Sequence, residues 1–149
     1  MPLLNYTTEV PVARTMGQIQ GLLIGAKAQK ILTEFTPEGR VSALSFQINS
    51  NFGILSIRMP AKIQACYKIL AAERSRSFDG KKLFEQAERI AWRIVKDWLE
   101  AQLAMIRVKQ AEIEQVFLPY IQDPQTGQTV YEKLAEQQFS GLALPAPKS

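Results

Sequence analysis

The segment RSRSFDGKK, at residues 74–82, holds the side chains in this sequence that are best suited to binding chemistry. It carries four cations and one anion, with Phe78 between two basic pairs. Cations can follow the phosphates of a nucleic acid, while an aromatic ring stacks on an unpaired base of any type. The segment is therefore a candidate nucleic-acid site made of Arg74, Arg76, Phe78, Lys81 and Lys82. The alternative, and the commoner behaviour of polar connectors, is a solvated loop with Phe78 folded inward.

The distribution of charge points in the same direction. The net charge is +4, but residues 27–82 hold ten Lys and Arg against four Asp and Glu, while residues 83–149 hold seven against nine. A basic half joined to a slightly acidic half is a weak indication of a polyanionic partner. Arg58, on the polar face of a predicted strand, and Lys62, just after that strand, join the candidate binding set.

Two tryptophans on one predicted helix offer further aromatic surface. When residues 83–106 are wound at about 100° per residue, their apolar side chains cover more than half of the circumference, with Trp98 near the middle. Such a helix is expected to be largely buried. We therefore expect Trp98 in the core and Trp92, at the edge of the arc beside Arg89 and Lys96, at an interaction surface.

The residue types that most enzymes depend on are scarce. Histidine is absent, which removes the commonest general base, the Ser–His and Cys–His nucleophile pairs, and zinc sites built on imidazole. No carboxylate spacing typical of a metal site stands out. The single cysteine, Cys66, lies among apolar residues, and we expect a buried structural thiol in a reducing compartment. We predict a protein that is not an enzyme and that needs no cofactor or metal.

Gly17, Gly21 and Gly25 recur every four residues along another predicted helix. Each glycine costs a helix about 1 kcal/mol relative to alanine, so the repeat predicts a neighbour that packs very close to the backbone. The favoured neighbour is the domain's own sheet, and the alternative is a helix of a partner molecule. With Trp92, the three glycines form a candidate interaction surface, and the long apolar helix predicts a homo-oligomer.

The elements that would carry these residues follow from the periodicity of the apolar side chains. Residues 4–12 are β-prone and predict a short edge strand stopped by Pro11. A capping box of Thr15 and Gln18 then opens a helix. A period of two follows, with turn sequences at 37–40 and 49–53 between three strands, at 29–35, 41–48 and 54–59. This pattern predicts a three-stranded antiparallel meander with one polar face.

Helices follow the meander. The pattern predicts one at 61–73, a long one at about 81–118 closed by Pro119, and a short one at 130–138 opened by a capping box of Thr129 and Glu132. Residues 140–149 are expected to be an extended or flexible tail. The order (β)αβββααα, in a single domain over residues 1–149, is an α+β fold in which helices cover one face of an antiparallel sheet.

Targeting segments are not expected. No run of about 18 apolar residues is present, and the N-terminal MPLLNYTTEV lacks the basic start and long apolar stretch of a secretory signal. The expected location is therefore the cytoplasm, without a membrane association.

Several segments carry a resemblance to known proteins. YTTEVPVARTMGQIQGLL, ALSFQINSNFGILSIRMPA, AWRIVKDWLEAQLAMI and VFLPYI resemble a family of small bacterial and phage-type proteins of unknown function. The α-β-β-β-α order is also similar to that of the double-stranded-RNA-binding domain, and the meander plus helix to the core of single-strand-annealing proteins. The basic helix start of the double-stranded-RNA-binding domain is not matched, because the corresponding segment MPAKIQACYK supplies only Lys62 and Lys68. These likenesses concern topology, which does not fix function.

Two functions remain open from the sequence. The first is a non-enzymatic nucleic-acid-binding protein of bacterial or phage origin, acting on single strands or without sequence preference. The second is an interaction or assembly module that forms a homo-oligomer through its apolar helices and binds no nucleic acid. A contiguous basic surface would support the first, and an exposed apolar stripe beside Gly21 or Trp92 would support the second.

Overall fold

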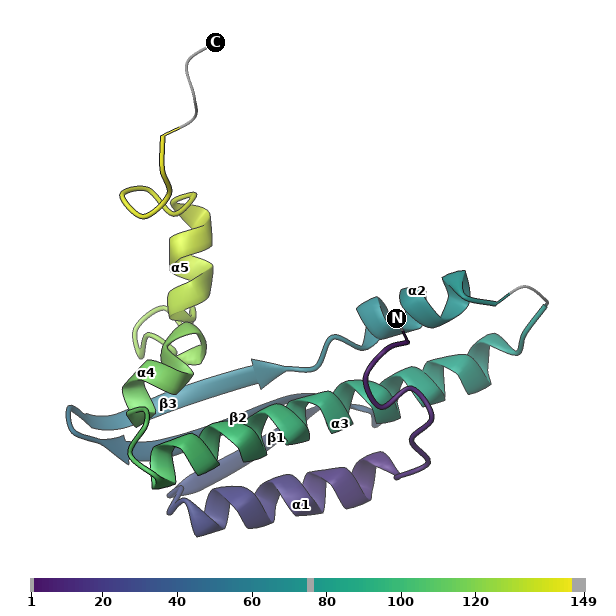
Figure 1. The fold of residues 1–149 in the computed structure, drawn as a ribbon, viewed down its shortest axis with the longest axis horizontal. Coiled ribbons are helices and arrows are strands. Elements are labelled where there is room, and N and C mark those ends of the chain that lie inside the picture. Colours follow the sequence, from purple (N-terminus) through teal and green to yellow (C-terminus); the bar gives the residue numbers. More distant parts are fainter. Residues whose placement is uncertain (1, 75–76, 146–149) are drawn as a thin grey trace.

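The computed structural model describes residues 2–74 and 77–145 and has an α+β fold built on a three-stranded antiparallel sheet, as predicted. Figure 1 shows α1 and α3 side by side across one face of the sheet, α2 along the start of α3, and α5 projecting from the body. The elements in chain order are α1 (Val12–Gly25), β1 (Lys30–Phe35), β2 (Val41–Ser50), β3 (Gly53–Pro60), α2 (Ile63–Ala72), α3 (Gly80–Arg107), α4 (Ile113–Phe117), the 3-10 helix η1 (Leu118–Tyr120) and α5 (Val130–Glu136).

The sheet follows the period of two that the sequence indicates. On β2, Leu44, Phe46 and Ile48 are buried under the helices, while Ser45 and Gln47 lie on the opposite face. The strand order is β1-β2-β3, so β2 is central and pairs with both neighbours. The β2–β3 turn closes through Gly53, whose φ of 108° is a conformation that other residues rarely adopt.

Helix α3 contributes to both hydrophobic cores. The larger core joins the inner sheet face to α1 and to the middle of α3, and its fully buried members include Ile19, Phe46, Trp92 and Phe117. The smaller core joins α2 to the first half of α3, through residues such as Leu70 and Ile90. One helix therefore holds the sheet, α1 and α2 together.

The sequence predicts that Trp98 is the more deeply buried of the two tryptophans, and this prediction is wrong. Trp92 is fully buried, and its indole N–H donates to the Val41 carbonyl at 3.4 Å. Trp98 is half-buried at the margin of the larger core, with its ring against those of Phe117 and Tyr120. Because α3 packs against the sheet and α1 on one side and α2 on another, the apolar arc alone does not say which part of it lies deepest.

The long helix ends at Arg107, and not near residue 118 as predicted. Lys109 has a positive φ of 61°, and its neighbour Gln110 donates its backbone N–H to the Met105 carbonyl, which closes the helix. The chain then turns back, so that Phe117 reaches the core and lies edge-on to Phe46. No glycine or proline marks this break in the sequence, and burial of Phe117 provides its physical reason.

The N-terminal segment forms turns, and not the predicted edge strand. Asn5 has a positive φ of 63°, and the backbone N–H groups of Tyr6 and Thr8 donate to carbonyls three residues earlier. Helix α1 begins directly after Pro11, so Thr15 lies inside the helix and is buried; it does not cap it. A proline suits the start of a helix because its φ is already fixed near the helical value.

The C-terminal segment is joined to the sheet before it projects. Ile121 bridges Ile57 on β3, and Gln122 donates its backbone N–H to the Ser56 carbonyl at 2.8 Å. The predicted capping box of Thr129 and Glu132 is confirmed. The hydrogen bond from Lys133 holds the pKa of the Asp123 carboxyl below its ordinary value, with help from backbone N–H donors.

In the predicted tail, Leu142 and Leu144 are exposed, and residues 146–149 lie outside the described residues. Among the helices described, none combines the length and the apolar character needed to cross a membrane.

We predict that Trp92→Ala destabilises the fold by about 3–5 kcal/mol, because it empties a fully buried site. Trp98→Ala should cost clearly less, since part of that ring already faces water. Urea unfolding of the two variants beside the wild type measures both losses. A larger loss for Trp98→Ala than for Trp92→Ala would contradict the orientation of α3 described above.

Candidate nucleic-acid interface

The connector between α2 and α3 presents an aromatic ring and cations at one end of the molecule. Phe78 is 42% exposed, so its ring is not folded into the core. Arg74, Phe78 and Lys82 line one open depression of about 510 Å³. Arg76 lies outside the described residues. The structure thus brings together three of the five residues that the sequence proposes for this segment, while Lys81 is exposed one residue before Lys82.

A second aromatic side chain, Tyr6, lines the same depression and is 49% exposed. The N-terminal segment is fixed there by Gln86 of α3, whose side-chain amide donates to the Tyr6 carbonyl at 3.1 Å and to the Thr8 carbonyl at 2.9 Å. Asn5 also donates to the Asp97 carboxylate at 2.8 Å. Sequence reasoning missed Tyr6 because it assigned this segment to a strand, and no local signal links it to a residue 72 positions away.

Asp79 has a structural role within the basic connector. Its carboxylate caps α3 by accepting the backbone N–H of Lys81 at 3.0 Å and, more weakly, that of Lys82 at 3.4 Å. This bond fixes where the helix begins, and therefore where the two lysines stand. An anion at a helix N-terminus also offsets the positive end of the helix dipole, so the local positive field comes from the side chains.

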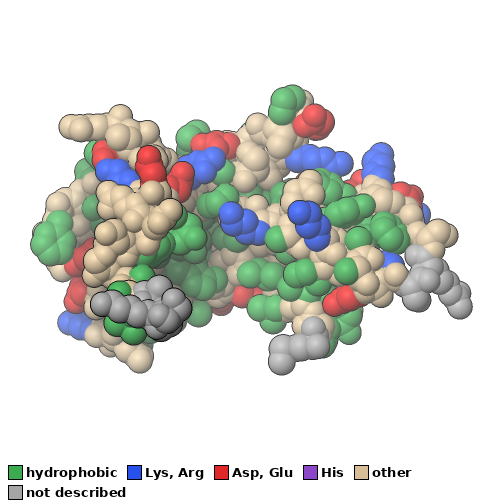
Figure 2. Space-filling view, turned by 90° about the horizontal axis from the view of Figure 1, so that it is seen from above, with side chains coloured by type: hydrophobic (Ala, Val, Ile, Leu, Met, Phe, Trp, Pro, Cys, Tyr) green, Lys and Arg blue, Asp and Glu red, His purple; other side chains and the backbone are tan. Residues whose placement is uncertain are grey.

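Arg58 and Lys62 lie in a different place from the connector. Both line a second depression of about 560 Å³, between the end of β3 and the C-terminal segment, where Tyr120 and Tyr131 also lie. Lys62 precedes α2 and Arg74 follows it, so a helix of ten residues, about 15 Å long, separates the two places. Figure 2 shows Lys and Arg side chains on the α2 side of a hollow, facing the C-terminal segment across it.

Arg58 is already engaged within the sheet. Its Nη2 donates to Glu34 Oε2 at 2.9 Å, and since Arg58 is on β3 and Glu34 on β1, the ion pair crosses β2 on the polar face. A cation that has a carboxylate partner contributes less to phosphate binding than a free one. Arg58 is therefore the weakest member of the proposed set.

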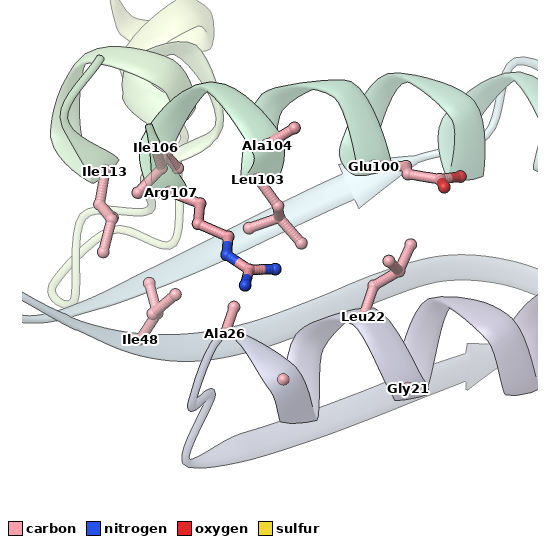
Figure 3. Close-up of a pocket in the computed structure, with 11 residues that line it drawn as sticks. Gly21, Leu22, Ala26, Ile48, Glu100, Leu103, Ala104, Ile106, Arg107 and Ile113 are labelled. Carbon is pink, nitrogen blue, oxygen red and sulfur yellow. The ribbon is translucent and has the colours of Figure 1, made fainter. Parts of the chain in front are cut away.

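The glycine stripe does not pack against the sheet, which corrects the favoured prediction. No described heavy atom outside the helix lies within 4 Å of a Cβ built on Gly17, Gly21 or Gly25. Gly21 and Gly25 instead line an apolar groove of about 470 Å³ between α1 and the end of α3, with Leu22 and Leu103 on opposite walls (Figure 3). Trp92, predicted to join this interaction surface, is buried and cannot contact a partner.

The described residues offer no group of three or more His, Cys, Asp or Glu side chains that could hold a metal ion. Cys66 is buried in the smaller core, and burial raises the pKa of its thiol. A thiol with a raised pKa and little access to solvent is a poor nucleophile. The geometry around Cys66 is therefore that of a packing residue.

Comparison of the chain with protein-family models, with curated proteins and with solved structures finds no match to any of them. The resemblance to small bacterial and phage-type proteins stays a prediction.

We predict that Cys66 reacts far more slowly with a disulfide reagent in the folded protein than after unfolding in urea, measured at pH 8. The folded pKa lies above the unfolded one, so the thiol contributes stability below its ordinary pKa and loses that contribution as pH rises through the raised value. Equal rates in the folded and unfolded protein would contradict the burial of this residue.

Proposed function

We propose that this protein binds single-stranded nucleic acid without catalysing a reaction, through the depression at the α2–α3 connector. One observation carries the proposal: two exposed aromatic rings, Tyr6 and Phe78, line the same open depression as two cations, Arg74 and Lys82. Stacking platforms combined with basic side chains are the usual means of binding single strands without sequence preference.

Single strands suit this surface better than a duplex. The bases of a duplex are stacked on one another, so their faces are closed to a side chain, whereas an unpaired base can lie on an aromatic ring. The surrounding charge supports the same conclusion, because residues 27–82 carry an excess of cations. Lys62 and Arg58, in the second depression, would extend the contact along α2.

The proposed site of action is the cytoplasm, which suits a chain with one unpaired, buried thiol. A second candidate function, assembly of the chain into a homo-oligomer, is supported by the apolar groove between α1 and α3 and by the exposed glycines of α1. The two functions are compatible, since the groove and the connector have no lining residue in common.

The role of the cations is tested by Arg74→Gln/Lys82→Gln. This variant should weaken binding to all single strands alike, and the slope of log K against log salt should shrink by about 0.7 for each phosphate that is no longer neutralised. Fluorescence anisotropy with labelled oligonucleotides at several salt concentrations measures both quantities. Arg107→Gln/Lys109→Gln is the matched control, because it removes two cations at the other end of α3, about 40 Å away. Equal losses of affinity in the two variants would mean that the effect is one of net charge alone.

The role of the rings is tested by Phe78→Ala and Tyr6→Ala. Each should weaken single-strand binding by about 1–3 kcal/mol and leave the salt slope nearly unchanged, because stacking releases no counterions. Phe52→Ala is the control: that ring is 81% exposed at the β2–β3 turn and lines neither depression. A wild-type protein that binds neither DNA nor RNA at low salt would end the proposal.

A further inference from the structure

The two edges of the sheet differ in how they are closed. The outer edge of β3 is covered by the C-terminal segment, through the Ile57–Ile121 bridge and the Gln122 N–H donated to Ser56. On the other side, β1 pairs with β2 alone among the described residues. An open edge presents unpaired backbone groups and is a template for another strand.

Large apolar side chains of the edge strand β1 are exposed to solvent. Leu32 is 59% exposed on the polar face of the sheet, and Phe35, after a register shift at the end of the strand, is 61% exposed. Soluble proteins usually protect an open edge with charges, proline or a bulge. In β1 these features stand towards the ends, as Lys30, Glu34 and the register shift after Glu34, while the centre of the strand is the apolar Leu32. Among the described residues, nothing covers this exposed centre, so it is open to a strand from another molecule.

The charge pattern of β1 is self-complementary and suits pairing with a second copy of the same strand. Lys30 and Glu34 flank Leu32 at two residues on either side, so all three lie on one face of the strand. If a second copy pairs antiparallel with Leu32 opposite Leu32, each Lys30 faces a Glu34 and each Glu34 faces a Lys30. Opposite charges placed directly across two strands attract, and like charges repel. Arg58 bonds to Oε2 of Glu34, which leaves Oε1 of Glu34 as an acceptor for Lys30 of the second copy.

Helix α1 has a flank that suits the same arrangement. Ala13, Gly17, Gln20 and Ile24 recur at spacings of four, three and four, and all are exposed. This flank points away from α3, since Gln18, on another side of α1, bonds to Arg93 of α3. Figure 1 shows α1 running along the β1 side of the sheet. Pairing of the strands would therefore bring the two copies of α1 together.

Close contact of these two helices requires small side chains between them, because the distance between helix axes depends on the residues at the contact. Gly17 has open space where a side chain would stand. In an antiparallel pair centred near Gln20, the gap at Gly17 lies opposite Ile24 of the second copy. This gives Gly17 a packing role that no neighbour among the described residues provides.

We propose that two copies of this chain pair antiparallel through β1, with Leu32 at the two-fold axis, to form a continuous six-stranded sheet. This names the partner surface for the second candidate function, assembly, and it is independent of nucleic-acid binding. It differs from association through the apolar groove, which lies on the other side of α1.

A charge exchange tests the register. Lys30→Glu and Glu34→Lys each place like charges opposite one another twice, so each should weaken the dimer by about tenfold or more in sedimentation equilibrium. An equimolar mixture of the two variants should recover the dimer, because every introduced charge then meets an opposite one. Glu34→Lys also removes the bond to Arg58, so Leu32→Lys, at an exposed position, serves as a second variant, and circular dichroism checks that each one folds.

Two further arms separate this proposal from assembly by another surface. Gly17→Leu should weaken the dimer at least as much, while Gly21→Leu, which places the same side chain in the groove, should leave it unchanged. Amide exchange in β1 should slow as protein concentration rises. If the dimer is unaffected by Lys30→Glu but is lost in Gly21→Leu, the β1 interface is wrong, while the proposal that the chain forms a homo-oligomer still stands. If the wild-type chain stays monomeric at high micromolar concentration, both the β1 dimer and the homo-oligomer are wrong. A strand of another protein would then be the remaining partner for the β1 edge.

Discussion

Helix α3 covers the inner face of the sheet, and the rest of the structure depends on this contact. Its middle, around Trp92 and Leu99, closes the larger core, while its first half, around Leu83 and Ala87, closes the smaller one with α2. Because both cores share one rigid rod, the connector at its start and the groove at its end keep a fixed separation. The candidate binding surface is therefore carried by the same element that holds the protein together.

One charged contact links this helix to the turn between β1 and β2. Glu88, buried on α3, forms an ion pair with Arg40, the residue just before β2, and the Arg40 guanidinium lies 5.0 Å from the centre of the Phe84 ring. Loss of Arg40, which is itself partly exposed, would leave the buried Glu88 carboxylate without its partner, which is unfavourable. The pair thus ties the β1–β2 turn to one position along α3, and with it the register between sheet and helix.

The sequence predicts the strands well and the helix ends poorly, for a physical reason. Alternation along β2 and β3 is specific because a shift of one residue would expose Leu44, Phe46 and Ile48 together. The end of α3 is not predictable, because burial of Phe117 decides it and no glycine or proline marks it. The basic connector is evident from composition alone, whereas Tyr6 joins it only through tertiary contacts with Gln86. The glycines of α1 stand out by their spacing, but a helical period does not reveal what surrounds them.

The contact between α1 and α3 has a consequence for synthesis on the ribosome. Gln18 of α1 bonds to Arg93, 75 residues later, so α1 has no helix to dock on until most of the chain has been made. Until then, its apolar side chains Met16, Ile19 and Leu23 can only rest on the newly formed strands. Local hairpins form faster than contacts of such long range. The meander should therefore be assembled while its inner face is still partly bare, and the arrival of α3 is the step that ends its exposure to other chains.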